Sequence, residues 1–474
     1  MADFTLGEFL AQSQRSMGGG LLGRASGPIS GYVFGPDFFR KQTYLQISDT
    51  FVATYGKKVW DALNNRTVFF NAIKKVDWGP TVGWRLRTDR GSNRSRPVTE
   101  TGTLPTMDIS NYVGVYSNPK TVATTFGVTL KAQSVSGLEG GIGNQLAVEQ
   151  EAASRDHIKE LNQELLLGSW AVADGGGATA FNALPDSHAG YFRPGDTVTF
   201  WDDSGNTAMS IGANDDTAPD TISAVTPPNT TTGVVTLLTG PNAACANNDI
   251  MVVKSRAGFT SIDDVITQDA LVHAYGTQAN PGNVDVYNLT TRAAGGYAAG
   301  ATIVQTTPAA GVTTGTELSL AQIDSCINSV RQNGGEPKLI VTGLDTYDKI
   351  NQLLQVQQRY ADFVDYVVGV GDDRTYPGTR AGFQLATYRG IPVLPDPDIT
   401  KPADSQATSA ALASNIYVLD TDYLVMAIMY PTQYLENRDY FAANALVMRG
   451  MFFTLGEFRA LRPDVQAKVT GIQV

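Results

Sequence analysis

The stretch VGWRLRTDRGSNRSR, residues 82–96, decides the fold that we expect for this chain. Its apolar residues at positions 82, 84 and 86 alternate with glycine and arginine, and a period of two predicts a β-strand with one apolar face. From Arg85 to Arg96 there are five arginines and one aspartate, a local charge of +4. Because an isolated two-stranded hairpin is marginally stable in water, we expect a hairpin with this tip to dock on another surface.

The segments on either side extend this hairpin and lead into it. A second alternating run, with Phe126, Val128 and Leu130, follows a long polar excursion, and pairing of the two runs predicts an extended hairpin over residues 76–131. Residues 47–75 carry apolar residues at roughly helical spacing after a candidate cap, Asp49, which predicts a helix. Residues 1–46 are rich in glycine, serine and phenylalanine, so we expect an arm that lies on other parts rather than a separate core.

The clearest helix spans residues 144–167, between a glycine-rich breaker and Gly168. Asn144 is a candidate N-cap, and Glu151 and Arg155 are spaced for an ion pair on one face. The helix would be about 36 Å long, which is long for a globular domain, and its charged residues on several faces predict that one side is exposed. The apolar face is expected to consist of Leu146, Ala153, Ile158, Leu161 and Leu165.

Three further regions complete the chain. Residues 190–255 hold short β-rich runs separated by turn clusters, which predicts a small inserted β-barrel or sandwich. Residues 316–430 alternate helix and strand, beginning with a capping-box pattern at Ser319 and Gln322, and so predict an α/β lobe. Residues 431–474 have largely β character.

The composition excludes several classes of protein. Hydrophobic residues make up 42% of the chain and charged residues 17%, a globular composition with few charges. A net charge of −11 excludes a protein that wraps DNA, because neutralising phosphates requires an excess of lysine and arginine. The two cysteines, Cys245 and Cys326, are isolated and form neither a disulfide framework nor a zinc site. We expect no signal peptide, because the first residues lack a basic segment followed by an apolar run. We also expect no membrane contact, since the longest apolar run, residues 423–430, is too short to span a bilayer.

The sequence offers no candidate catalytic residue, cofactor-binding residue or metal ligand. His157, His188 and His273 lie in different segments without metal-ligand spacing. The aspartates between residues 202 and 220 lack the spacing and the closing glutamate of a calcium loop, so hairpin turns are favoured over a calcium site. We therefore expect a protein that is not an enzyme and has no cofactor.

The order of these parts resembles that of the major capsid proteins of tailed double-stranded DNA viruses, which include tailed phages and their archaeal relatives. These proteins have the Hong Kong 97-type fold. Three short motifs agree with the resemblance. Residues 59–64 (VWDALN) look like the family's first helix, residues 388–393 (YRGIPV) like its axial-domain strand turn, and residues 462–472 like its closing strand. The resemblance covers nearly the whole chain except residues 190–255, which look like an added domain.

The resemblance implies an α+β fold with a defined order of domains. These are the N-terminal arm (1–46), a helix leading to the E-loop (47–75), the E-loop hairpin (76–131), the peripheral domain with its spine helix (132–189), the inserted β domain (190–255), the peripheral domain continued (256–315), the axial domain (316–430) and closing strands that return to the peripheral domain (431–474).

The implied function is self-assembly as hexamers and pentamers into an icosahedral shell that encloses packaged double-stranded DNA. The implied location is the virion capsid, assembled in the host cytoplasm. The implied partners are copies of the chain itself, a separate scaffolding protein, a portal and decoration proteins, with loose contact to the DNA. Some members join subunits through a Lys–Asn isopeptide bond, but no lysine lies between Lys75 and Lys120, so we expect no such cross-link.

The hairpin supplies the candidate site. We expect its guanidinium groups to pair with carboxylates of a neighbouring subunit, where desolvation strengthens such pairs. A mobile surface loop, or a loop that contacts nucleic acid, is the alternative. The expected intersubunit contact residues are Arg85, Arg87, Arg90, Arg94, Arg96 and Glu100.

Two other functions remain open from the sequence. A tail or decoration component of a virion would be β-dominated and would lack a long helix after a polar-tipped hairpin. A carbohydrate-binding β protein would agree with the aromatic content and the inserted β module, but it would need paired carboxylates near aromatic platforms, and we find no such pair.

Overall fold

The computed structural model of the chain combines helices and sheets, which confirms the α+β class. Contacts divide the chain into two units, of which the first comprises Met1–Ala62, Gly127–Gln150 and Asn437–Arg449, and the second the remainder. The expected arm and residues 47–66 of the helix expected over residues 47–75 lie outside the described residues. The structure describes residues 67–79, 83–87, 97–104, 110, 112–136, 144–174, 179–184, 186–201, 220–226, 233–239, 249–266, 272–273, 276–277, 286–289, 303–306, 316–355, 387–401, 413–437 and 446–473.

The first unit contains the helix α5 (Leu130–Ser136) and the beginning of the long helix α6 (Gln145–Leu165). Gln133 connects them, because its side-chain amide donates to Asn144 Oδ1 (2.8 Å) and its Oε1 accepts from the Leu146 N–H (2.9 Å). Asn144 Oδ1 also accepts from the Ala147 N–H (3.3 Å), the bond of an N-cap. The helix expected over residues 144–167 is therefore confirmed, with its end two residues earlier.

The part of α6 that lies in the second unit packs into the main hydrophobic core. Leu161 and Leu165 are buried there, close to Phe69 of the short helix α4 (Phe69–Ala72) and Phe458. The expectation for Ile158 was wrong, since its side chain is 41% exposed, whereas the neighbouring His157 is fully buried. His157 occupies the inner face because both ring nitrogens find hydroxyl partners.

A four-stranded sheet has the order β1-β19-β20-β4 and corrects two expectations. β1 (Lys74–Asp77) pairs in parallel with β19, so residues 74 and 75 form a strand and not a helix end; their backbone groups bond to β19 instead. The run with Phe126 and Val128 belongs to β4, which pairs with β20, whereas residues 83–87 pair with a different strand. The other strands of this sheet are β4 (Lys120–Thr129), β19 (Leu424–Asn437) and β20 (Val447–Ala460).

The hairpin strands are β2 (Gly83–Arg87) and β3 (Tyr112–Tyr116), which pair antiparallel with Gly83 opposite Tyr116. The return strand therefore begins at Tyr112, which is 14 residues before Phe126, where the return strand was expected to begin. Pro119, which has no backbone N–H to donate to a ladder, lies between β3 and β4.

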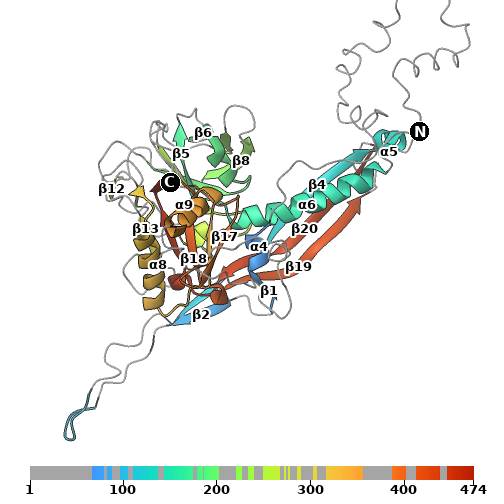
Figure 1. The fold of residues 1–474 in the computed structure, drawn as a ribbon. Helices are drawn as coiled ribbons and strands as arrows, with labels where there is room; N and C mark the ends of the chain where they lie inside the picture. Colours follow the sequence, from blue (N-terminus) through green and yellow to red (C-terminus); the bar gives the residue numbers. More distant parts are fainter. Residues whose placement is uncertain are drawn as a thin grey trace, which may run out of the picture. The chain divides into compact units, whose positions relative to one another are not determined.

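A closed barrel has the strand order β10-β5-β6-β9-β8-β7 (Figure 1). Its interior is filled by apolar side chains, among them Phe181, Phe200 and Met251. The barrel starts at Trp170, so residue 190, the expected start of the inserted domain, lies inside it. The strands are β5 (Trp170–Asp174), β6 (Ala180–Leu184), β7 (Thr197–Trp201), β8 (Asp220–Thr226), β9 (Val234–Leu237) and β10 (Asp249–Ser255), with the 3-10 helix η2 (Asp186–Tyr191).

A six-stranded sheet of order β13-β21-β18-β15-β17-β16 forms the α/β lobe, with α8 (Leu320–Gln332) and α9 (Leu344–Gln355) packed on it (Figure 1). The expected capping box is present, since the Ser319 N–H donates to Gln322 Oε1 (3.0 Å). The closing strand β21 pairs antiparallel with β18, so it lies in this sheet. The strands are β13 (Ile303–Thr306), β15 (Leu339–Thr342), β16 (Thr387–Tyr388), β17 (Ile391–Pro395), β18 (Ile416–Leu419) and β21 (Ala467–Thr470).

The remaining elements are short. They are α7 (Ile262–Val265), the 3-10 helices η4 (Thr421–Tyr423) and η5 (Pro463–Val465), the pair β11 (Val272–His273) and β12 (Gly276–Thr277), and the pair β14 (Thr316–Glu317) and β22 (Ile472–Gln473).

Candidate functional site

The base of the hairpin has one face that packs against its own chain. Val115 is 1% exposed, and Trp84, opposite it across the two strands, donates from Nε1 to the Leu461 carbonyl (3.1 Å). The Trp84 ring also meets the Tyr287 ring edge to face, with centroids 5.2 Å apart. Trp84 and Val115 therefore face the body of the second unit.

A short turn, residues 286–289, holds β3 in place. The side chain of Asn288 bonds two backbone groups of β3. Its Oδ1 accepts from the Tyr116 N–H (2.9 Å) and its Nδ2 donates to the Gly114 carbonyl (3.0 Å). Tyr287 has a φ of 61°, which a non-glycine residue rarely adopts. This conformation accompanies hydrogen bonds from Tyr287 Oη to the Phe458 carbonyl (2.9 Å) and from the Ala460 N–H to Oη (2.7 Å).

Arg459 lies beneath the hairpin base. Its guanidinium carbon is 4.0 Å from the centroid of the Trp78 ring, and its Nε donates to Ser117 Oγ (2.8 Å). Burial lowers the pKa of Arg459 from its ordinary value. The inner face of the hairpin is thus held by aromatic, cation–π and hydrogen-bond contacts, including one between Arg459 and the Trp84 ring.

The outer face combines arginine with exposed tyrosine. Arg87 stands opposite Tyr112 in the ladder and Arg85 opposite Gly114, and both arginines are exposed. Tyr112 is 59% exposed and Tyr116 is 53% exposed. Tyrosine and arginine are enriched, together with tryptophan, among the residues that dominate the binding energy at protein interfaces. We call Arg85, Arg87, Tyr112 and Tyr116 the outer hairpin face.

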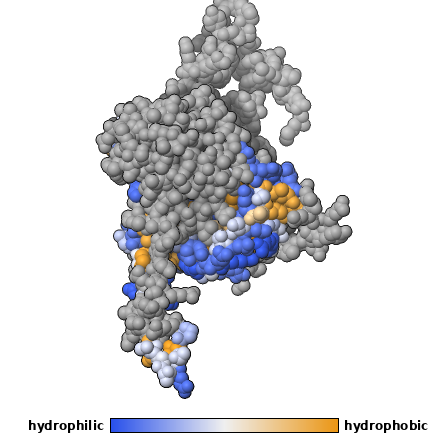
Figure 2. All heavy atoms as spheres, turned by 90° about the vertical axis from the view of Figure 1, so that its left-hand side faces the viewer, coloured by the Kyte–Doolittle hydropathy of each residue, from blue (hydrophilic) through white to orange (hydrophobic). Residues whose placement is uncertain are grey.

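The other expected contact residues have different outcomes. Arg90, Arg94 and Arg96 lie outside the described residues. Glu100 is exposed at a turn in which the Gly102 N–H donates to the Thr99 carbonyl (2.9 Å). Figure 2 shows one face of the molecule, on which the described surface is mostly hydrophilic with hydrophobic patches among it.

The two tyrosines were missed from the sequence. The run YVGVY, residues 112–116, alternates with a period of two in the same way as residues 82–86 and would have identified β3. Asn288 carries no such signal, because its role depends on where the turn 286–289 meets the strand edge.

Two of the histidines examined for catalysis or metal binding have structural partners, whereas the side chain of His273 and the aspartates between residues 202 and 216 lie outside the described residues. His157 lies between Thr124 Oγ1 (3.0 Å) and Thr454 Oγ1 (2.8 Å), and His188 stacks on Tyr191 with ring centroids 4.5 Å apart. Burial lowers the pKa of His188 to about 3. Across the described ranges, no group of three or more histidine, cysteine, aspartate or glutamate residues is arranged to hold a metal ion. None of the helices that the structure describes is both long and apolar enough to cross a membrane.

Comparisons with known proteins add a family match. Residues 212–441, slightly less than half of the chain, match the sequence model of the SU10 major capsid protein. No curated protein sequence matches the chain significantly.

Several solved structures resemble the chain at low sequence identity. The cyanophage A-1(L) capsid asymmetric unit is 13% identical, with 88% of this chain and 96% of that chain covered and a TM-score of 0.48. The capsid of the native GTA particle is 11% identical, with 95% and 100% covered and a TM-score of 0.43. A structure from Gordonia phage Cozz is 9% identical, with 88% and 90% covered and a TM-score of 0.40.

Proposed function

We infer that the chain is a major capsid protein of the tailed-virus type, whose function is to form the capsid shell. The family match over residues 212–441 carries this conclusion. The chain accordingly associates with copies of itself and is located in the capsid. The order of hairpin, long helix, α/β lobe and long β-strands agrees with the Hong Kong 97-type fold expected from the sequence.

We propose that the copies assemble as hexamers and pentamers into a closed icosahedral shell around packaged double-stranded DNA, in the host cytoplasm. A separate scaffolding protein, a portal and decoration proteins are the proposed partners, and the chain itself catalyses no reaction. A net charge of −11 supports loose rather than tight contact with the DNA, because a shell wall of this charge repels phosphate.

The outer hairpin face is the proposed contact with a neighbouring copy. Residues 85–96 carry +4 of a total charge of −11, which leaves −15 on the remainder of each copy (−11 − 4 = −15). A copy therefore offers an acidic surface to the hairpin of its neighbour, and opposite charges steer the encounter and set its register. The exposed tyrosines add apolar area that becomes buried in the same contact.

The experiment is co-expression of the chain with its scaffolding protein, followed by negative-stain electron microscopy. The wild-type chain is expected to give closed shells. The double variant Arg85→Ser, Arg87→Ser is expected to give a folded chain, by circular dichroism, that forms few or no shells. The matched control is Arg331→Ser, which removes an exposed arginine from α8 and is expected to leave shell formation unchanged.

Two outcomes count against the proposal. A wild-type chain that stays monomeric at every salt concentration contradicts the shell function. Normal shells from the double variant contradict the role of the hairpin while leaving the shell function intact.

A further inference from the structure

The barrel is connected to the rest of the second unit by two neighbouring chain segments, residues 166–169 and 255–258, which we call the stem. The first runs from the end of α6 to the start of β5, and the second follows β10. The two segments are bonded to each other, since Arg256 Nη2 donates to the Gly168 carbonyl. The Val253 N–H of β10 also donates to the Ser169 carbonyl (2.9 Å). A movement of the barrel against α6 must therefore bend the stem.

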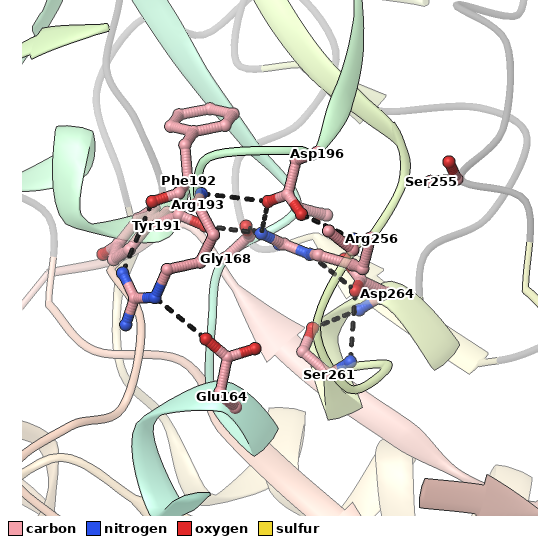
Figure 3. Close-up of polar contacts among 12 residues, drawn as sticks. Glu164, Gly168, Tyr191, Phe192, Arg193, Asp196, Ser255, Arg256, Ser261 and Asp264 are labelled. Carbon is pink, nitrogen blue, oxygen red and sulfur yellow. Dashed lines mark hydrogen bonds and ion pairs between the residues drawn. The ribbon is translucent and has the colours of Figure 1, made fainter. Parts of the chain in front are cut away.

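Arg256 is the centre of a buried polar cluster at the stem (Figure 3). Its side chain is 1% exposed. Nε donates to Asp264 Oδ2 of α7 (2.9 Å), and Nη1 donates to Asp196 Oδ2 just before β7 (3.2 Å). Nη1 also donates to the Tyr191 carbonyl at the end of η2. Arg256 thus links the stem to α7 and to the base of the barrel.

Glu164, on the last turn of α6, joins this cluster from the other side (Figure 3). Its Oε1 accepts from Arg193 Nε (2.8 Å). Its Oε2 is buried and has no hydrogen-bond partner among the described residues. A Cβ placed on Gly258, in the stem, would lie 2.1 Å from this oxygen, so the carboxyl group lies directly against the stem.

The charges around Glu164 are unbalanced. The groups that face it are the guanidinium groups of Arg193 and Arg256 and the carboxyl groups of Glu160 and Asp196, and Asp264 faces Arg256. With every group ionised, two positive and four negative charges leave the cluster at −2. Of these four carboxyl groups, Glu164 is the one that has a buried oxygen without a hydrogen-bond partner among the described residues. A proton on Glu164 therefore reduces the excess negative charge and removes the cost of burying an unpaired carboxylate.

We propose that Glu164 is a proton-dependent latch of the stem, closed when its carboxyl group is neutral and loosened when that group is ionised. An ionised Oε2 is stabilised by water, which it reaches when the stem opens. A neutral carboxyl group can still accept the Arg193 hydrogen bond through Oε1, so the closed arrangement survives protonation.

The direction of the pH effect follows from the pKa of Glu164. Burial, opposed by Arg193 and assisted by Glu160, raises this pKa from 4.5 to about 7 in the closed stem. The closed form therefore holds a proton that the open form releases between these two values, and acid favours closing. As the pH rises from 4.5 to 7, the ratio of closed to open stem falls by at most about tenfold per pH unit, and above that range it is constant.

Hydrogen exchange of the purified full-length chain, followed by mass spectrometry from pH 5 to pH 8.5, tests the proposal. The reporters are peptides containing the Ser169 and Ala257 amides, which donate to Asp263 and Asp196. Their protection factors, corrected for the chemical exchange rate, are expected to fall up to pH 7 and then to level off. Glu164→Gln, which copies the neutral carboxyl group, is expected to give constant protection at the level of the acid form.

Glu151→Gln is the matched control, because Glu151 lies on the same helix outside the cluster, with a side chain that is 69% exposed. In this variant the protection factors of the stem peptides are expected to fall with pH as they do in the wild-type chain. The proposal is overturned if Glu164→Gln keeps that fall, or if the wild-type stem shows none. It is also overturned if the protection factors of peptides from β9, a strand of the barrel away from the stem, fall with pH in the same way. This comparison needs no variant. Because the measurement uses free chains, its outcome is independent of shell formation.

Discussion

Replacing one aromatic residue on each face of the hairpin separates folding from assembly. Trp84→Ala removes a side chain from the inner face, and Tyr112→Ala removes one from the outer face, on the facing strand of the same hairpin. If the inner face holds the hairpin on its own chain and the outer face binds a neighbouring copy, the two variants impair different properties. Trp84→Ala lowers the stability of the free chain, and Tyr112→Ala lowers its ability to assemble.

The expected magnitudes come from the contacts of each ring. Trp84 makes a hydrogen bond to the Leu461 carbonyl and an edge-to-face contact with Tyr287. A hydrogen bond contributes about 1 kcal/mol and an aromatic pair about 1 kcal/mol, and the apolar area lost from a half-buried ring adds about 1–2 kcal/mol. The free energy of unfolding is therefore expected to fall by about 3 kcal/mol. Tyr112 is 59% exposed, and its loss is expected to change the same quantity by less than about 0.5 kcal/mol.

Urea denaturation of the free chain, monitored by far-UV circular dichroism, measures the first effect, and light scattering during assembly with the scaffolding protein measures the second. Trp84→Phe is the matched control, because it keeps the ring contact and loses the hydrogen bond, and about 1 kcal/mol is expected for it. Equal destabilisation of the free chain by Trp84→Ala and Tyr112→Ala would refute the assignment of the two faces.

Two further predictions concern contacts inside the second unit. Asp263 is buried and is bonded by Lys468 Nζ (2.8 Å), Ser169 and Tyr417. Burial alone would raise the pKa of Asp263, but Lys468 lowers it below the ordinary 3.8. The ion pair therefore stabilises the folded chain fully above pH 3.8, and this stabilisation is lost as the pH falls through the lowered pKa. Lys468→Met is expected to cost about 3–5 kcal/mol at pH 7 and less near pH 3, measured by denaturation at the two pH values, and an equal cost at both would contradict this account. Asn288→Ala is expected to cost about 1–2 kcal/mol by the same assay, because two backbone groups of β3 lose their partner, and an unchanged midpoint would show that Asn288 does not hold the strand.

Elements with strong local signals were predicted well from the sequence. The helix α6 has a capping asparagine, a regular apolar face and a terminal glycine, and its position was correct to within two residues. The strand β7 is one of the β-rich runs expected within residues 190–255, because Thr197–Trp201 is rich in β-favouring residues and a turn cluster follows it.

Elements that depend on distant partners were missed. β5 and β6 are short and rich in alanine, which has little intrinsic preference for strands, and their place is set by pairing with β10 and β9 in the closed barrel. The partner of residues 83–87 was placed at residues 126–130 because both runs alternate, whereas β4 pairs with β20, more than 300 residues later in the sequence. Alternation identifies a strand but does not identify its neighbour.

The candidate site was predicted in part, for the same reason. The position of Arg85 and Arg87 on an exposed face follows from the alternation with Trp84 and Leu86. Glu164 was expected among the charged residues of a partly exposed helix, and it is 3% exposed. Its burial depends on Gly258, which follows the last strand of the barrel and is brought against α6 by the fold of the barrel. A helical period cannot contain that information.

Cryo-electron microscopy of the assembled particle tests the central claim most directly. The reconstruction is expected to show a closed shell in which Arg85, Arg87, Tyr112 and Tyr116 of each copy are buried against another copy, with carboxylates next to the arginines. A particle in which these four side chains face solvent in every copy would contradict the proposed contact, and the absence of any closed shell would contradict the proposed function itself.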